Sequence, residues 1–376
     1  MKKTITILLA TMLLFAFISC NNEGNIDDAF NCTITFDGNG ATKGEMATQT
    51  TGRGVGIKLN ANTYERDKYL FAGWNTKADG SGTPYTDGQK IKVSGNTTLY
   101  AQWEIDAIIL DSSMDIWTDG NVYILNSSIT IGNRIEVSGS VTLILNDGCK
   151  LTASEGINVT EGNSITINAS GEGTGILEAT GHAGAAGIGS YNYHNSGTII
   201  INGGTVNANT EDGAGIGGGS GGSGGTIIIN GGIVTVSSKK GAGIGGGSGG
   251  SGGTIIINGG IVTVSSKQGA GIGGGNEGSG GSITINSGTV NANADNGGAG
   301  IGGGSNGSGG SITINGGTVT ACSKSFDSSA GIGRGAGSGS DGTLTLADGV
   351  SLQVSHNNTD WSDYNGTTRN KYMKTV

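Results

Sequence analysis

The acidic and basic side chains of the Gly-rich part of the chain are the first candidates for chemistry. A glycoside hydrolase needs two carboxylates at a fixed separation, and a polysaccharide lyase needs a base beside cationic groups or calcium. Between Thr198 and Ser340 the acids fall in or beside turns without a paired cluster, and the bases stand singly. We therefore expect solvated turn charges, no catalytic residue and no enzyme, with a degenerate glycan lyase or hydrolase as the least favoured alternative. The acids are Glu211, Asp212, Glu277, Asp295 and Asp327, and the bases are Lys239, Lys240, Lys267, Lys324 and Arg334.

Metal, cofactor and nucleic-acid sites are not predicted. His182, His194 and His356 lack metal-ligand spacing, and no C-x-x-C motif is present. Gly-rich strings match G-x-G-x-x-G because Gly fills most positions, and none continues into a P-loop. A net charge of -9 disfavours nucleic acid.

One loop is richer in side chains than its equivalents. Residues 191–195 read Tyr-Asn-Tyr-His-Asn where later segments of equal length have Gly and Ser. Tyr191, Tyr193 and His194 give this loop a flat, hydrogen-bonding surface that suits a sugar ring or a protein contact. Local packing over a neighbouring irregular segment is the alternative for these side chains.

These candidates are positioned by an internal repeat. The element Ala-Gly-Ile-Gly recurs with spacings of 28, 28, 28, 29 and 31 residues, and two short β-prone pieces follow it in step. One unit cannot bury its Ile and Val side chains alone, but units stacked about 4.8 Å apart form an unbroken apolar column. This arrangement is a right-handed parallel β-helix over residues 106–355. The repeats start at Ala186, Ala214, Ala242, Ala270, Ala299 and Ala330.

Alternation along each piece then assigns its side chains. Ile227 and Ile229, and Val234 and Val236, are expected to point inward, together with Ile216. Ile200, Ile228 and Ile256 are expected to point outward as an apolar column, a candidate contact surface that Thr284 and Thr313 end. A column of Asn side chains is expected to form a structural amide ladder. Its members are Asn202, Asn230, Asn258, Asn286 and Asn315.

The end of the array needs a cover. Thr343–Leu346 and Val350–Val354 are expected to form the last coil, and residues 356–376 to form a cap over its open edge. The composition agrees with an all-β fold, because 78 Gly and 1 Pro without a Gly-X-Y period exclude collagen. The Val141–Gly148 segment and the Gly-Ile-Gly and Ile-x-Ile-Asn-Gly-Gly elements resemble the Gly-rich β-helical repeats of bacterial surface proteins, some of which bind polysaccharide.

The first twenty residues indicate export. Lys2 and Lys3 precede an apolar stretch that ends in Phe-Ile-Ser-Cys, which resembles the lipobox of bacterial lipoproteins. The resemblance implies that residues 1–20 are a lipoprotein signal peptide, that Cys20 is lipidated and that residues 21–30 form a tether. The partner would be a membrane, and the protein would be anchored at the cell envelope, at the outer membrane or cell surface. A conventional signal peptide cleaved nearby is the alternative. Cys32, Cys149 and Cys322 are expected to be core thiols, with one disulfide possible.

A first domain is expected over residues 31–104. Its Phe36-Asp-Gly-Asn-Gly, Phe71-Ala-Gly-Trp-Asn and Leu99-Tyr-Ala-Gln-Trp elements resemble the internalin-type B repeat, also called the Listeria–Bacteroides repeat. The resemblance implies a small β-grasp-like module of bacterial surface proteins. We expect Trp74 and Trp103 to fill its core. The chain is therefore expected to act without enzymatic activity in adhesion or ligand display, with polysaccharide binding as the alternative.

Overall fold

The computed structural model describes residues 31–324, 329–355, 361–364 and 372–376. The chain divides into two compact units between Asp106 and Ala107. The expected signal peptide, Cys20, the tether and His356 lie outside the described residues. Within the described ranges, no helix is long and apolar enough to cross a membrane.

The first unit is built on a mixed five-stranded sheet with the order β2-β1-β7-β4-β5, and β3 and β6 form a separate antiparallel two-stranded sheet. Trp74 is 1% exposed and lies 4.8 Å from Phe36 and 5.0 Å from Phe71, measured between ring centroids. Trp103 is only partly buried and donates from Nε1 to the carbonyl oxygen of Gly38. The small sheet domain and the core role of Trp74 are confirmed. The strands are β1 (Asn31–Asp37), β2 (Gln49–Gly52), β3 (Gly56–Lys58), β4 (Tyr69–Asn75), β5 (Pro84–Tyr85), β6 (Lys90–Lys92) and β7 (Thr97–Ile105).

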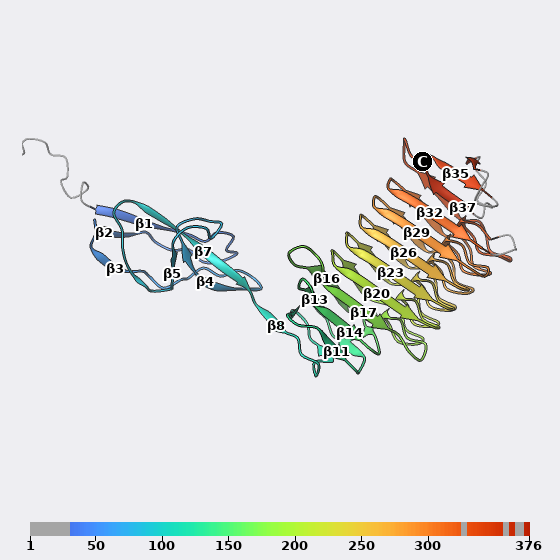
Figure 1. Ribbon diagram of the computed structural model, residues 1–376, viewed down its shortest axis with the longest axis horizontal. Helices are drawn as coiled ribbons and strands as arrows, with labels where there is room; N and C mark the ends of the chain where they lie inside the picture. The colour runs from blue at the N-terminus through green and yellow to red at the C-terminus, as the bar shows by residue number, and fades with distance from the viewer. Residues whose placement is uncertain (1–30, 325–328, 356–360, 365–371) are drawn as a thin grey trace, which may run out of the picture. The chain divides into compact units, whose positions relative to one another are not determined.

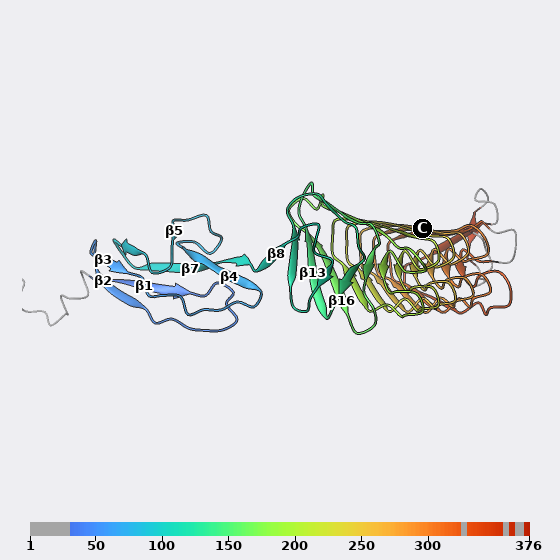
Figure 2. The same ribbon diagram turned by 90° about the horizontal axis from the view of Figure 1, so that it is seen from below.

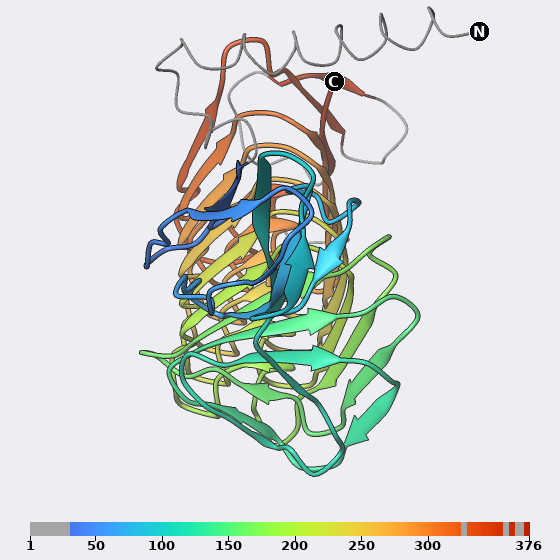
Figure 3. The same ribbon diagram turned by 90° about the vertical axis from the view of Figure 1, so that its left-hand side faces the viewer.

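The second unit is a parallel β-solenoid, as the repeat predicts. Each regular coil contributes one strand to each of three sheets, and the coils follow one another from green to red without a change of direction (Figures 1 and 3). The first sheet holds ten strands in parallel register. They are β8 (Ala107–Ile109), β10 (Val122–Leu125), β13 (Ser140–Leu145), β16 (Ser164–Ala169), β19 (Thr198–Ile201), β22 (Thr226–Ile229), β25 (Thr254–Ile257), β28 (Ser282–Ile285), β31 (Ser311–Ile314) and β34 (Thr343–Leu346).

The second and third sheets complete each coil, and their connecting loops line up along the solenoid in Figure 2. The parallel strands of the second sheet are β11 (Ile129–Ile131), β14 (Lys150–Ala153), β17 (Ile176–Thr180), β20 (Thr205–Thr210), β23 (Ile233–Ser238), β26 (Ile261–Ser266), β29 (Thr289–Ala294) and β32 (Thr318–Ser323). The third sheet holds β9 (Ile116–Trp117), β12 (Ile135–Val137), β15 (Ile157–Asn158), β18 (Ile188–Gly189), β21 (Ile216–Gly217), β24 (Ile244–Gly245), β27 (Ile272–Gly273), β30 (Ile301–Gly302) and β33 (Ile332–Gly333).

The interior and the amide ladder agree with the sequence. Ile216, Ile227, Ile229, Val234 and Val236 are all buried in one continuous apolar core. Each Asn of the ladder donates from Nδ2 to Oδ1 of the Asn one coil earlier at 2.7 Å, and Asn168 continues the ladder. Cys32 and Cys322 are buried and Cys149 is half-buried, and all three are free thiols.

Glycine allows neighbouring coils to approach closely in the third sheet. Gly245 has a φ of +129°, and a Cβ atom there would lie 2.1 Å from the carbonyl oxygen of Gly273 in the next coil. No L side chain fits this contact without backbone movement. The Gly of Ala-Gly-Ile-Gly that follows Ile is thus required by packing between coils.

The end of the solenoid differs from the expectation. Residues Val350–Val354 were expected to form part of the last coil, but β35 (Leu352–Ser355) does not pair with β32. Instead β37 (Tyr372–Thr375) lies between β32 and β35 and pairs antiparallel with both, and β36 (Ser362–Asp363) pairs with β35. The chain therefore reverses direction at this end, and antiparallel strands rather than a further parallel coil cover the edge of β32.

Candidate functional site

The Tyr191 loop follows β18 and rests on two earlier coils. The Tyr191 hydroxyl donates to Oε1 of Glu136, and the Cζ atom of Arg134 lies 4.9 Å from the centroid of the Tyr191 ring. Burial, followed by the hydrogen bond and the negative charge of Glu136, raises the pKa of Tyr191. Tyr191 therefore contacts the irregular coil of β12, two coils before its own, and its side chain remains 40% exposed.

Arg134 holds the base of the same loop. Its guanidinium is largely buried and donates to five carbonyl oxygens in two successive coils, and burial lowers the pKa of Arg134 to about 10. Such charge-assisted bonds to backbone acceptors fix the irregular coils in register. The acceptors belong to Glu155, Ile157, Ala186, Gly189 and Ser190, at 2.7, 3.2, 2.9, 3.0 and 3.4 Å.

Tyr193 and His194 lie at the surface of the loop. Tyr193 is 81% exposed and has a φ of +62°. Its ring lies against Gly221 of the next coil, where a Cβ atom would come within 2.8 Å of the Tyr193 Cδ1 atom. The exposed His194 ring places Nδ1 2.9 Å from the carbonyl oxygen of Asn192. Of the three predicted residues, Tyr193 offers the largest free surface.

The isoleucine column aligns as predicted. Ile200, Ile228 and Ile256 are register partners on β19, β22 and β25, and Thr284 follows them on β28. The three Ile side chains are half-buried, because stacked neighbours about 4.8 Å apart shield one another.

A second pair of isoleucines, which the sequence reasoning missed, is more exposed. Ile233 and Ile261 are register partners at the start of β23 and β26, and they are 48% and 49% exposed. The alternation that turns Val234 inward could have identified them, because it turns Ile233 outward.

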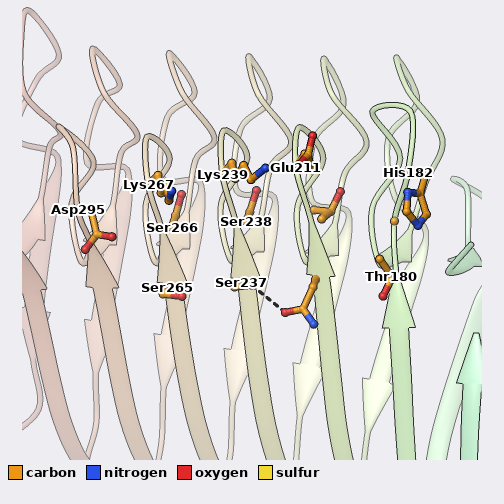
Figure 4. Close-up of a pocket in the computed structure, with 13 residues that line it drawn as sticks. Thr180, His182, Glu211, Ser237, Ser238, Lys239, Ser265, Ser266, Lys267 and Asp295 are labelled. Carbon is orange, nitrogen blue, oxygen red and sulfur yellow. Dashed lines mark hydrogen bonds and ion pairs between the residues drawn. The ribbon is translucent and has the colours of Figure 1, made fainter. Parts of the chain in front are cut away.

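A groove of about 470 Å³ runs across the second sheet, and its lining residues lie side by side on successive coils (Figure 4). Its floor is the register column Thr180, Asn209, Ser237 and Ser265 at the ends of β17, β20, β23 and β26. Its wall is formed by the loops that follow these strands. The side chains of the wall include His182, Glu211, Lys239, Lys267 and Asp295.

Six turn charges at or near this groove form three ion pairs between coils, so the expectation that they stand singly was wrong for these six, whereas Lys267 forms no ion pair with any described residue. Lys239 binds Glu211 of the preceding coil, and Lys240 lies 3.0 Å from Asp212. Lys324 lies 3.0 Å from Asp295 one coil earlier. The residue offsets of 28 and 29 equal one repeat, and this signal could have revealed the pairs from the sequence.

No metal centre is assembled by these groups within the described part of the chain, where no three His, Cys, Asp or Glu side chains could together hold an ion.

Both units match family models of known proteins. Residues 33–102 match the family model described as the Listeria-Bacteroides repeat domain. Five segments, 199–220, 223–248, 251–276, 283–305 and 312–343, match the model described as the beta helix repeat.

One relative of known sequence is a "Putative Gly-rich membrane protein" of Evansella cellulosilytica, 38% identical over 76 residues. The aligned part is 19% of this chain and 9% of that protein, so this chain spans only a small part of its relative. No solved structure matches. The chain therefore carries a Listeria-Bacteroides repeat domain followed by a run of β-helix repeats.

Proposed function

We propose that this chain is a lipid-anchored protein of the bacterial cell surface that acts, without enzymatic activity, in adhesion or ligand display. The two family matches support the surface location, as does the Gly-rich membrane protein that resembles part of the chain. The Phe-Ile-Ser-Cys sequence ending at Cys20 supports the anchor. Two lipid chains or one chain with a second signal give stable membrane attachment.

The observation that carries the adhesive role is the column of Ile200, Ile228 and Ile256. It places branched apolar side chains at fixed intervals on strands that are paired on both sides, so little entropy is lost when a partner binds. The more exposed Ile233 and Ile261 follow on the next strand of the same coils. Outward apolar groups in such an ordered array are typical of protein-contact surfaces.

The adhesive role is tested with protein-coated beads on immobilised extracellular-matrix proteins and mucin. The triple variant Ile200→Thr, Ile228→Thr and Ile256→Thr gives the column the residue that β28 and β31 carry naturally at Thr284 and Thr313. We expect bead retention to fall while the thermal unfolding midpoint changes little. The matched control replaces Thr35, an outward residue of the first unit, with Ser and should retain the beads. Equal retention by the triple variant would refute the column as the adhesive surface.

The anchor is tested by labelling bacteria with a palmitate analogue. We expect the wild-type chain to carry the label in the membrane fraction, and Cys20→Ala to lose the label and leave that fraction. A labelled Cys20→Ala chain would place the acyl group elsewhere and contradict the proposed anchor.

Polysaccharide binding is the second candidate function, and the groove of the second sheet and the exposed Tyr193 ring favour it. A glycan array tests it with purified protein. Loss of the array signal in Tyr193→Ala would place the sugar at the loop. Tyr191→Phe is the control and should keep the signal, because the Tyr191 hydroxyl is already bonded to Glu136. An array without any bound glycan would remove this candidate. Formation of new reducing ends during incubation with polysaccharides would instead support the degenerate glycan-cleaving enzyme.

A further inference from the structure

We propose that the groove of the second sheet binds a linear polysaccharide whose chain runs along the solenoid axis. This inference rests on the second proposed function and names its site. The groove extends from the coil of Thr180 to the coil of Asp295, which follow the strand order β17-β20-β23-β26-β29. Four intervals of about 4.8 Å give a groove about 19 Å long.

The floor of the groove repeats hydrogen-bonding groups at the spacing of the coils. Thr180, Asn209, Ser237 and Ser265 occupy the same register position, so a hydroxyl or amide group recurs at each step along the axis. The Ser237 hydroxyl donates to Oδ1 of Asn209 at 2.7 Å, which leaves the Ser237 oxygen as an acceptor and the Asn209 Nδ2 as a donor. Both groups donate and accept hydrogen bonds, as the hydroxyls of a sugar do. The interval is close to the length of one pyranose ring in an extended glycan, so successive rings would meet equivalent partners.

The wall of the groove is held in place by buried hydroxyls. Thr210 donates to the carbonyl oxygen of Ala185 at 2.8 Å, and Ser238 donates to that of Gly213 at 2.8 Å. Ser266 makes the equivalent bond to Gly241 at 2.7 Å, whereas Ala294 of the next coil has no hydroxyl. These bonds tie each wall loop to the end of a strand one coil later. A wall fixed before binding lowers the entropy cost of holding a flexible glycan.

The charges of the groove favour a glycan with few charges. Glu211 is paired with Lys239, and Asp295 is paired with Lys324, so these four groups balance. Lys267 forms no ion pair with any described residue. The net charge of -9 repels a polyanion from the molecule as a whole. Lys267 therefore offers one attraction for an isolated acidic substituent on an otherwise neutral chain.

A peptide fits this groove less well than a sugar. Peptides that join a sheet need unpaired backbone groups at its edge. In the wall, backbone amides already donate to carbonyl oxygens of the preceding coil. The amide of Lys239 donates to Glu211, that of Lys267 to Ser238 and that of Asp295 to Ser266. Only side chains remain for a ligand, and small hydroxyl and amide groups recognise sugar hydroxyls.

The experiment uses the purified chain on an array of linear and branched oligosaccharides, and the strongest linear hit is then titrated by calorimetry. Ser265→Trp fills the groove floor, and Thr263→Trp is its matched control, since Thr263 is exposed on the same face of β26 but does not line the groove. We expect Ser265→Trp to weaken binding by about tenfold or more and Thr263→Trp to leave it unchanged. Lys267→Gln should weaken only glycans with an acidic group, and Lys240→Gln, outside the groove, should not.

The outcomes separate this inference from the function on which it rests. If glycans bind and Ser265→Trp binds them as tightly as wild type while Tyr193→Ala does not, polysaccharide binding stands and the groove is refuted. If only branched oligosaccharides bind the wild-type chain, polysaccharide binding stands and the inference of a linear ligand is refuted. If no oligosaccharide of either kind binds, both the inference and the second proposed function fall. Circular dichroism of Ser265→Trp and Thr263→Trp shows whether each variant keeps the solenoid. If Ser265→Trp does not fold, Ser265→Tyr with Thr263→Tyr repeats the comparison.

Discussion

Replacing Gly245 with Ala tests the close packing of coils in the third sheet. The added Cβ would lie 2.1 Å from the carbonyl oxygen of Gly273, and the φ of Gly245 is +129°. Backbone strain at such a φ costs about 1–3 kcal/mol, and forcing a methyl group into a packed contact costs about 1–3 kcal/mol more. We therefore expect Gly245→Ala to lower the free energy of unfolding by about 4 kcal/mol.

Gly249→Ala is the matched control within the same coil. Gly249 also has a positive φ, +81°, but the nearest atom to its added Cβ is 3.9 Å away, in Gly221. Gly249→Ala should therefore be destabilised only by the strain of a left-handed backbone, which lowers the free energy of unfolding by about 1–2 kcal/mol. Any stabilising effect of Ala on the unfolded chain is the same in both variants and cancels in the comparison.

Urea unfolding followed by far-ultraviolet circular dichroism measures the difference. We expect a midpoint for Gly245→Ala well below that for Gly249→Ala, with a comparable slope. The defect should also loosen the adjacent coils, because each coil of a solenoid is stabilised mainly by its neighbours. Equal midpoints for the two variants would show that the backbone relaxes around the new methyl group, and would refute the role assigned to this glycine.

Three further variants test contacts described above. Asn258→Ala removes the side-chain hydrogen bonds to Asn230 and Asn286 and should lower the free energy of thermal unfolding by about 1 kcal/mol. The control Gln268→Ala, at an exposed position, should lower it less, and equal losses would argue against the ladder. Arg134→Met deprives five carbonyl oxygens of a charged donor and should lower the free energy of urea unfolding by about 3 kcal/mol or more. Lys240→Met, at an exposed position, is the control, and a loss as small as the control's would show that Arg134 does not fix the register. Because the pKa of Tyr191 is raised above 10.0, its stabilising contribution is complete below pH 10 and is lost as the pH rises through the raised pKa. Tyr191→Phe should therefore lose less stability than wild type between pH 9 and pH 11, measured as the urea midpoint, and identical pH profiles would contradict the Glu136 contact.

Contacts between equivalent residues of neighbouring coils could be predicted from the sequence. The inward Ile and Val side chains, the Asn ladder and the outward Ile200 column all follow from one repeat length combined with alternation along a strand. The pair Lys239 and Glu211 obeys the same rule, since one repeat separates the two residues. A period in the sequence becomes a fixed contact in space wherever coils stack in register.

Contacts that do not follow the repeat were decided by the tertiary structure. Tyr191 meets Glu136 over 55 residues, across early coils of irregular length, and no period connects the two positions. No repeated element in the sequence predicts that β37 pairs antiparallel between β32 and β35. The groove likewise needs both its floor and its wall, and the wall depends on how far each loop stands out from the sheet.

The amino-acid sequence by itself thus determined the architecture, because stacking near-identical segments is the only way in which so few apolar side chains per segment can form a continuous core. The tertiary structure decided which surfaces are open to a ligand. Exposure depends on the loops, on the irregular first coils and on the cap, and in those parts the side-chain contacts are set by three-dimensional fit rather than by a repeated pattern.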